Sequence, residues 1–290
     1  MFGLCTDRVS SLIGRNVSPR VCRVVEAQGE QRRLGCAAAA GIAMIIRQAR
    51  FYRLAEVFFD DDSAPPRVDI IEHFQRSRPL PRAQCADFHT LQLDLTQDAE
   101  TLFTGFSKTC QYGIRRAERD DLKEDAWISA RDEQVDDFIE FFNRFAHAKA
   151  IPPAPAERLH TLASARLLDL TTVTRHDDTL VWHAYLRTGN RARQLHSASR
   201  FREYTDTATR NLIGRANRYL HWHDILLYKE AGIPLFDFGG WYAGRQDEDL
   251  LRINAFKEEF AGRVVREYHC AVPGSMRGRM MLFARRCRNR

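Results

Sequence analysis

Two hydrophobic periods run along this chain and divide it into strands and helices. Stretches in which apolar and polar residues alternate, or in which β-branched residues gather between turn residues, predict strands. The strands predicted in this way are a hairpin over residues 20–41, single strands at 88–95, 170–177, 234–240, 264–270 and 280–285, and a second hairpin over 179–201.

Apolar residues that recur three and four positions apart predict the helices. Helices are predicted at 68–77, 98–121, 133–148, 156–168, 210–231 and about 253–260. Pro79 and Pro81 end the first helix, because proline lacks the backbone N–H that a helix needs. Gly232 follows the long helix at 210–231 and is a typical C-terminal stop.

The order of these elements predicts a mixed α/β sheet. A doubly wound nucleotide-binding fold would need more strand–helix repeats and a Gly-x-Gly-x-x-Gly turn, which the sequence lacks. The two hairpins are of one type and lie far apart, which suggests two related halves. We expect a smaller first half over residues 1–97 and a larger second half over residues 98–290.

Length and composition support a globular protein with a large core. The chain has 290 residues, of which 44% are hydrophobic, and this excludes a disordered chain. The longest apolar run, residues 34–46, is shorter than the roughly 20 residues of a membrane span. The N-terminal residues lack the apolar core of a signal peptide. We therefore expect a cytoplasmic protein without a membrane span.

The seven cysteines predict neither a disulfide framework nor a metal site. Their number is odd and no Cys-x-x-Cys pair occurs. His221 and His223 are two positions apart on a predicted helix, so they point to different faces. We predict no bound metal, and free thiols fit a reducing compartment.

The charge of the chain is carried by arginine. The net charge is +6, and only five of the 44 basic residues are lysines. Arginine favours bidentate recognition of phosphate and carboxylate, so a phosphate-bearing partner such as CoA or tRNA is compatible with the sequence. Codon bias in a GC-rich genome is the alternative explanation.

Two segments resemble the FemAB-type and BioF2-like members of the GNAT superfamily of acyltransferases. Residues 221–268 contain a helix ending at Gly232, a strand ending in Asp237-Phe238-Gly239-Gly240, the pair Phe256-Lys257 and the Phe260–Gly262 turn. Residues 90–117 resemble the helix that enters the second domain in that family, with its Ile-Arg-Arg-Ala cluster.

The resemblance covers about residues 88–270 and implies a GNAT-type fold of two GNAT-like halves, of which the first is reduced. The helical arm of the larger family members is missing, so recognition of a cell-wall precursor is not implied. The implied activity is the transfer of an aminoacyl or acyl group to an amine.

Lys257 and Asp237 are the predicted catalytic residues. An ammonium group beside the developing oxyanion would stabilise it, although a solvated lysine on a short helix is the plainer interpretation. Asp237 lies within an apolar strand, where burial would raise its pKa and suit a general base. Its alternative is a structural carboxylate bonded to the backbone.

The remaining candidates would bind substrates. Phe256, Gly239, Gly240 and Trp241 would line the substrate site, and Tyr112, Arg115 and Arg116 form a basic helix face for the phosphates of a tRNA or a nucleotide-linked acceptor. Arg210, Gly214 and Arg215 resemble a degenerate GNAT pyrophosphate loop at a helix start. A solvated helix face and an ordinary helix start are the respective alternatives.

The sequence therefore predicts an N-acyltransferase that acts by direct attack of an amine acceptor, which is a small molecule or a peptide. The donor is aminoacyl-tRNA or acyl-CoA, and no tightly bound cofactor is expected. The degenerate phosphate loop and the basic charge favour aminoacyl-tRNA. The alternative is a non-catalytic RNA- or ligand-binding protein on a decayed GNAT scaffold.

Overall fold

A computed structural model describes residues 23–24, 43–49 and 51–288. Within them, eleven strands form one mixed sheet in the order β1-β6-β7-β8-β9-β10-β5-β11-β4-β3-β2. This confirms the predicted mixed α/β class. The hairpin predicted at 20–41 falls mostly outside the described residues, of which only Arg23–Val24 form a short strand, β1.

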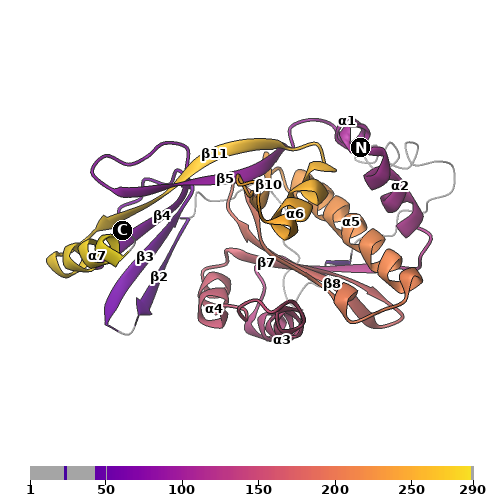
Figure 1. Cartoon of the computed structure of the whole chain (residues 1–290), viewed down its shortest axis with the longest axis horizontal. Coiled ribbons are helices and arrows are strands. Elements are labelled where there is room, and N and C mark those ends of the chain that lie inside the picture. The colour runs from indigo at the N-terminus through magenta and orange to yellow at the C-terminus, as the bar shows by residue number, and fades with distance from the viewer. Residues whose placement is uncertain (1–22, 25–42, 50, 289–290) are drawn as a thin grey trace, which may run out of the picture.

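One end of the sheet is built from strands close together in sequence and one C-terminal helix (Figure 1). Its elements are β2 (Met44–Ala49), β3 (Tyr52–Phe58), β4 (Ile70–Arg76) and α7 (Met276–Arg288). Two predictions are wrong here. The segment predicted as a helix at 68–77 contains strand β4 instead, because residues 70–76 pair with β3 in parallel and with β11 antiparallel. Residues 280–285 belong to helix α7 instead of a strand.

The two longest strands run side by side through the middle of the sheet. They are β5 (Gln84–Asp94) and β11 (Arg263–Pro273), and they pair antiparallel from Arg263↔Gln92 to Ala271↔Gln84. Strand β11 also pairs with β4, whereas β5 also pairs with β10. These two strands therefore join the ends of the sheet. The division predicted at residue 97 stays a prediction.

The other end of the sheet carries most of the helices. Its strands are β6 (Lys123–Trp127), β7 (Leu168–Arg175), β8 (Asp178–Arg187), β9 (Ala192–Ser199) and β10 (Leu235–Gly240). Its helices are α1 (Ala99–Gly105), α2 (Lys108–Ala117), α3 (Asp132–Lys149), α4 (Ala156–Ser164), the 3-10 turn η1 (Arg200–Arg202), α5 (Thr207–Glu230) and α6 (Glu248–Glu258). The second predicted hairpin is confirmed as β8 and β9.

Alternation along β8 decides which helices cover which face of the sheet. Trp182, Ala184 and Leu186 belong to the core cluster that contains α3 and α4. Tyr185 faces the other way, into the cluster that contains α5. Figure 1 accordingly shows α3 and α4 on one side of these strands and α5 on the other.

Two predicted helices differ from the structure in their boundaries. The helix predicted at 98–121 is two helices, because Phe106 has an extended backbone and Ser107 caps a new helix by accepting a hydrogen bond from the backbone N–H of Cys110. Helix α6 begins at Glu248, capped by Asp247, instead of near residue 253. No helix in the described part of the chain is both long and apolar enough to cross a bilayer.

Candidate functional site

The candidate site lies where neighbouring strands β9 and β10 stop pairing. The two strands are parallel and are in register only at Phe236↔Ala192 and Asp237↔Arg193. Just beyond, β10 contains a bulge between Asp237 and Gly240. At the bulge Gly239 has φ +72°, and a Cβ there would lie 2.7 Å from the carbonyl oxygen of Gln194. Glycine is therefore required at this position for both backbone conformation and space.

Lys257 of α6 reaches the end of the same strand. Its Nζ donates a hydrogen bond to the carbonyl oxygen of Gly240 at 2.6 Å. Burial of the ammonium group lowers the pKa of Lys257 to about 8, with the carboxylate of Asp237 opposing this effect and the charge of Arg193 adding to it. The lysine is half-buried, and it is mostly protonated at pH 7. The structure thus brings together Lys257, Asp237, Gly239 and Gly240, four of the predicted site residues.

Asp237 is the centre of a buried ionic cluster that joins four strands. Arg191, just before β9, donates to Asp237 and Glu267 with its guanidinium group; the Nη1–Oε1 distance to Glu267 is 2.8 Å. The Gln75 amide donates to both carboxylates at 2.9 Å. Thr90 Oγ1 and the backbone N–H of Gly239 also donate to Asp237. All these side chains are buried.

This environment does not suit Asp237 for accepting a proton. Burial alone would raise the pKa of Asp237, but Arg191, Arg193 and the hydrogen-bond donors around it outweigh burial and lower that pKa. The side chain has no exposed surface. The general-base role that the apolar strand suggested for Asp237 is therefore disfavoured. The residues next to Asp237 in sequence are apolar, but the groups around its carboxylate in the folded protein are polar and charged. Asp237 instead fixes the strand end beside Lys257.

Arg193 is the residue that sequence reasoning missed. Its guanidinium group makes no hydrogen bond or ion pair with any described residue, and its Nε is buried without a partner. Burial lowers the pKa of Arg193 to about 10; Asp237 opposes this, and the nearby cations Arg158 and Arg191 add to it. The group stays charged at neutral pH. A half-buried cation without a hydrogen-bond or ion-pair partner is unfavourable, so this arginine is a candidate for binding an anion.

Aromatic rings connect Arg193 to Arg158 across the sheet. Arg193 lies over the Phe88 ring at 5.7 Å, and Phe88 stacks on His269 with 4.2 Å between ring centroids. His269 contacts Phe74 edge to face at 5.1 Å, and Arg158 lies over Phe74 at 5.7 Å. We call these five residues the arginine–aromatic row. Its side chains come from β9, β5, β11, β4 and α4, so the row spans both ends of the sheet.

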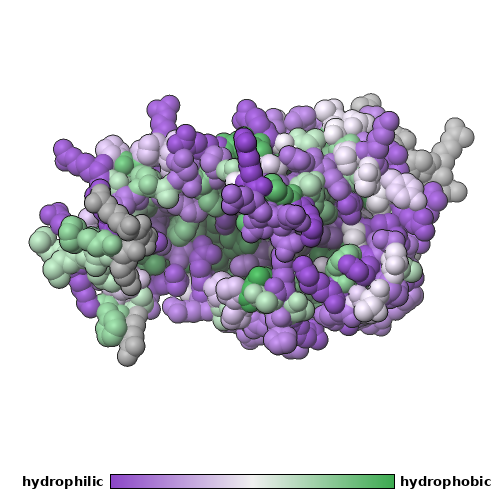
Figure 2. All heavy atoms as spheres, viewed as in Figure 1, coloured by the Kyte–Doolittle hydropathy of each residue, from purple (hydrophilic) through white to green (hydrophobic). Residues whose placement is uncertain are grey.

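The histidines in and beside the row are neutral. Burial, together with Arg193 and Arg158, lowers the pKa of both His269 and His196 to about 4. The Nε2 atom of His269 is buried without a hydrogen-bond partner among the described residues. The site therefore presents positive charge from its arginines and free hydrogen-bonding positions from a neutral histidine. Figure 2 shows that the molecule is hollowed between its two ends.

The other predicted substrate residues have two different locations. Phe256 and Trp241 are partly buried against the core cluster beneath the strand end, and the backbone N–H of Trp241 donates to His89 at 2.7 Å. Tyr112, Arg115 and Arg116 lie apart from them on the surface of α2. There Arg116 donates to the hydroxyl of Tyr112, which is 61% exposed.

Arg210, Gly214 and Arg215 lie inside α5 instead of at its start. The helix begins at Thr207, and Asp206 caps it by accepting from the backbone N–H of Thr209. Arg215 pairs with Asp120 at 2.7 Å, and Arg210 lies over the Phe201 ring. The backbone N–H groups of residues 214 and 215 are within the helix, so they are not free to bind a phosphate. The sequence placed this helix start too late.

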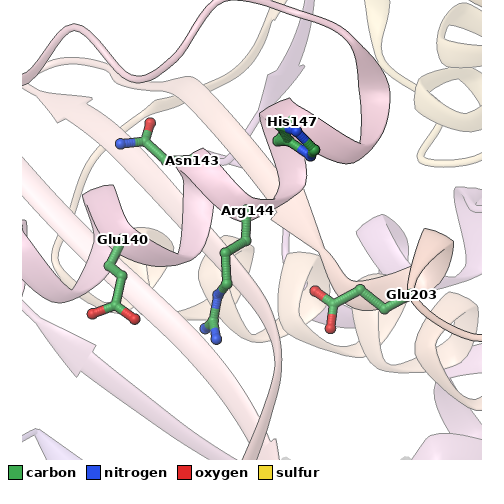
Figure 3. Close-up of a pocket in the computed structure, with 5 residues that line it drawn as sticks. All are labelled: Glu140, Asn143, Arg144, His147 and Glu203. Atoms are coloured by element: carbon green, nitrogen blue, oxygen red, sulfur yellow. The ribbon is translucent and has the colours of Figure 1, made fainter.

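Surface pockets lie away from these residues. One pocket of about 460 Å³ is lined by four side chains of α3 and by Glu203 after η1, with charges of both signs (Figure 3). Another, of about 630 Å³, is lined by Tyr242 and the acidic start of α6. Neither contains Lys257, Asp237 or Arg193, so neither defines the candidate site.

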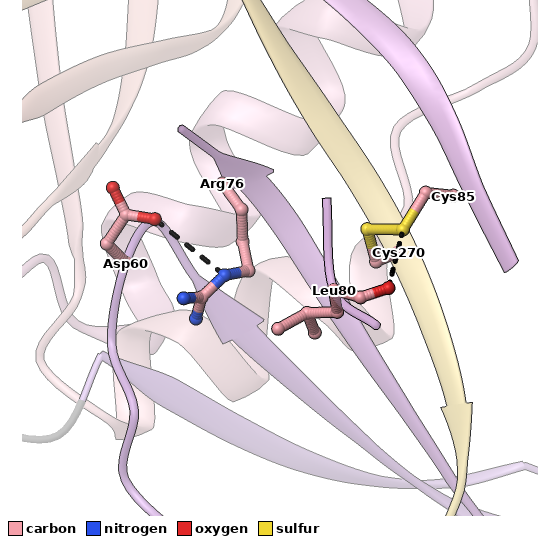
Figure 4. The surroundings of a disulfide bond; sticks show 5 residues. All are labelled: Asp60, Arg76, Leu80, Cys85 and Cys270. Carbon is pink, nitrogen blue, oxygen red and sulfur yellow. Dashed lines mark hydrogen bonds and ion pairs between the residues drawn. A yellow bond between two sulfur atoms is a disulfide. The ribbon is translucent and has the colours of Figure 1, made fainter. Parts of the chain in front are cut away.

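A disulfide joins the two central strands, contrary to the expectation of free thiols. Cys85 and Cys270 are directly opposite each other on β5 and β11 and are bonded. Figure 4 shows the bond beside the carbonyl of Leu80 and near the ion pair of Arg76 with Asp60. The partners are 185 residues apart in sequence, so only the strand register could reveal the pair. In the described part of the chain, Cys110 and Cys287 are free.

Comparisons with known proteins locate the fold. No family model matches the sequence, and no curated protein matches it. The structure of FemX is similar with a TM-score of 0.59 and 9% identity, covering 78% of this chain and 83% of FemX. L-PGS from Bacillus licheniformis is similar with a TM-score of 0.50 and 9% identity, covering 83% of this chain and 84% of that one. The chain therefore has a fold similar to that of FemX and L-PGS, and the resemblance to FemAB-type proteins is confirmed at the level of the fold alone.

Proposed function

We propose that this protein is an N-acyltransferase that moves an aminoacyl or acyl group to the amine of an anionic acceptor. The observation that carries the proposal is the placement of Lys257, a half-buried cation held at the end of β10 beside the unpaired cation Arg193. A fold similar to that of FemX supports the same reaction class.

The proposed reaction is a direct attack on a thioester or ester carbonyl. The amine lone pair forms the new C–N bond, and the carbonyl π electrons move to oxygen. Lys257, as an ammonium ion, stabilises that oxyanion. The attacking nitrogen loses a proton to water, and the oxyanion then re-forms the carbonyl and expels either the thiolate of CoA or the ribose oxygen of tRNA, which takes up a proton from water as it leaves. Asp237, Gly239 and Gly240 keep the lysine in position.

The acceptor site is proposed at the arginine–aromatic row. Arg193 would bind a carboxylate or phosphate of the acceptor, because a half-buried guanidinium group without an ion-pair partner gains most from a bound anion. His269 would donate or accept one further hydrogen bond. An acceptor anchored there would have its amine near Lys257, since Lys257 and Arg193 are close enough for their charges to repel.

The donor is proposed to be aminoacyl-tRNA, with acyl-CoA as the other possibility. Two observations support this order. Asp206, a carboxylate, occupies the start of α5 where a GNAT enzyme would bind pyrophosphate, and Tyr112, Arg115 and Arg116 leave a basic surface exposed on α2. Both donors are cytoplasmic molecules, so we propose a cytoplasmic site of action.

The test measures transfer with each donor. Purified protein is given labelled acetyl-CoA or a pool of charged tRNA, together with a panel of amines. Replacing Lys257 with Met should lower kcat by about 10²–10³-fold, the usual effect of removing one oxyanion partner. Lys123→Met, which changes an exposed lysine on β6, is the matched control and should keep full activity. Transfer that survives Lys257→Met unchanged would remove the lysine from the mechanism.

Paired acceptors test the anion site separately. Glycine is compared with glycinamide, and aminoethyl phosphate with ethanolamine. Arg193→Gln should raise KM for the anionic member of a pair and leave KM for the neutral member unchanged. Charged tRNA that binds without transfer to any amine would favour the non-catalytic scaffold instead.

A further inference from the structure

Helix α7 carries a stripe of apolar side chains that faces solvent. Met276, Met280 and Phe283 are 70%, 68% and 68% exposed, and they recur every three or four residues, so they lie along one face. Cys287, also exposed, continues the stripe. Figure 2 shows hydrophobic residues on the surface at the end of the molecule where Figure 1 places α7.

The opposite face of α7 is packed, and this fixes the direction in which the stripe points. Leu282 is buried against Leu54 and Ile70. Gly278 lies so close to the backbone of Asp69 that a Cβ would be 1.8 Å from its carbonyl oxygen. The guanidinium group of Arg285 pairs with Glu72 at 2.9 Å. The helix is therefore held on the sheet by one side while its apolar stripe faces outward.

Positive charge flanks the stripe on both sides. At 100° per residue, Arg279 and Arg286 lie along one edge of the stripe and Arg277 along the other. All three are exposed. The sequence from residue 276 to residue 290 contains six arginines and no acidic residue. An apolar face bordered by long basic side chains is the pattern of a helix that lies in a membrane interface.

We propose that α7 binds the surface of a bilayer that contains anionic lipid, with Met276, Met280 and Phe283 inserted among the acyl chains. The arginines would contact the lipid phosphates, and their stems can extend along the apolar boundary. The helix has 13 residues, which is too few to span a bilayer of about 30 Å, so it lies on the surface. This proposal is independent of the catalytic one.

The test is cosedimentation of the full-length protein with vesicles. Vesicles of phosphatidylcholine alone are compared with vesicles containing 30 mol% phosphatidylglycerol (about one lipid in three), because anionic lipid should attract the arginines. The protein should bind the anionic vesicles, and binding should weaken as salt is raised. The double variant Met280→Ser/Phe283→Ser should lose at least about 10-fold in vesicle partitioning.

A matched control distinguishes the loss of membrane insertion by α7 from a general loss of apolar surface. Leu250→Ser/Leu251→Ser changes two exposed apolar residues on α6 and should bind vesicles like the wild type. Circular dichroism and thermal unfolding would confirm that both variants are folded.

Three outcomes would overturn the proposal: no binding to anionic vesicles, equal binding by the α7 variant, or a lipid-free self-association that this variant abolishes. The last outcome would assign the stripe to a second copy of the chain.

Discussion

Two arginines near the start of β9 have opposite environments although they are two residues apart. Arg191 pairs with two carboxylates, and its guanidinium group also lies over the Phe59 ring at 4.4 Å. Arg193 makes no hydrogen bond or ion pair with a described residue; the charge of Asp237 attracts it, whereas Arg158 and Arg191 repel it. The first arginine therefore stabilises the fold, whereas the second is a cost to it that a bound anion would offset.

Substituting each arginine with glutamine should separate these roles. Arg191→Gln leaves Asp237 and Glu267 buried without their cation, so the free energy of unfolding should fall by about 3–5 kcal/mol. Arg193→Gln removes a half-buried charge that has no ion-pair partner among the described residues, and should leave stability equal or higher. Urea unfolding of the two variants beside wild type measures this. Equal losses in both would mean that Arg193 also has a structural partner.

The pH dependence of transfer should reveal how Lys257 acts. The pKa of Lys257 is about 8, so the ammonium charge is present below pH 8 and is lost as the pH rises through that value. If the charge stabilises the oxyanion, the kcat of wild type relative to Lys257→Arg should fall above pH 8, because arginine stays protonated there. A ratio that rises with pH would instead identify Lys257 as a base.

These residues also mark how far sequence reasoning reaches. Lys257 and Asp237 could be found because they belong to short segments that resemble a known family. For Arg191 and Arg193 the signal in the sequence was weaker. They are two basic residues two positions apart at the start of a predicted strand, and this spacing places both side chains on the same face. Nothing local showed that this face would meet Asp237 and Glu267, because those partners come from other strands.

At the scale of elements, two of the predictions failed because local period and tertiary pairing disagree. Val68, Ile71 and Phe74 have helical spacing, yet residues 70–76 are paired on both sides within the sheet. Residues 280–283 are a continuous apolar run, which predicts a strand. In the structure Leu282 is buried and Met280 and Phe283 are exposed. A helix whose apolar side faces water is an exception to the rule that apolar side chains are buried, and such exceptions often occur at functional sites.

The bulge of β10 should tolerate no side chain. Gly239 and Gly232 have nearly the same φ, +72° and +75°, but a Cβ at Gly232 would meet nothing within 4 Å. Gly232→Ala should therefore cost only the backbone strain of about 1–2 kcal/mol. Gly239→Ala should cost more and should also lower transfer, since the strand end must shift. Thermal unfolding and kcat of both variants test this, and equal effects would contradict it.

At the scale of the whole molecule, β5 and β11 set how the two ends are arranged. Each is eleven residues long, and their pairing runs without a break from Arg263↔Gln92, near the bulge of β10, to Ala271↔Gln84, near helix α7. The sequence predicted both strands but not their pairing. The paired residues are about 180 positions apart, and local sequence patterns do not indicate which distant segments will be neighbours.

The ionic cluster around Arg191 has a consequence for how the chain is made. Its members are at positions 75, 191, 237 and 267, so a ribosome exposes the arginine well before its last carboxylate partner. Until residue 267 emerges, the buried pair of Arg191 with Asp237 lacks the second carboxylate that completes its hydrogen bonds. The central strands therefore close late and together, and a growing chain should depend on chaperones until β11 has emerged.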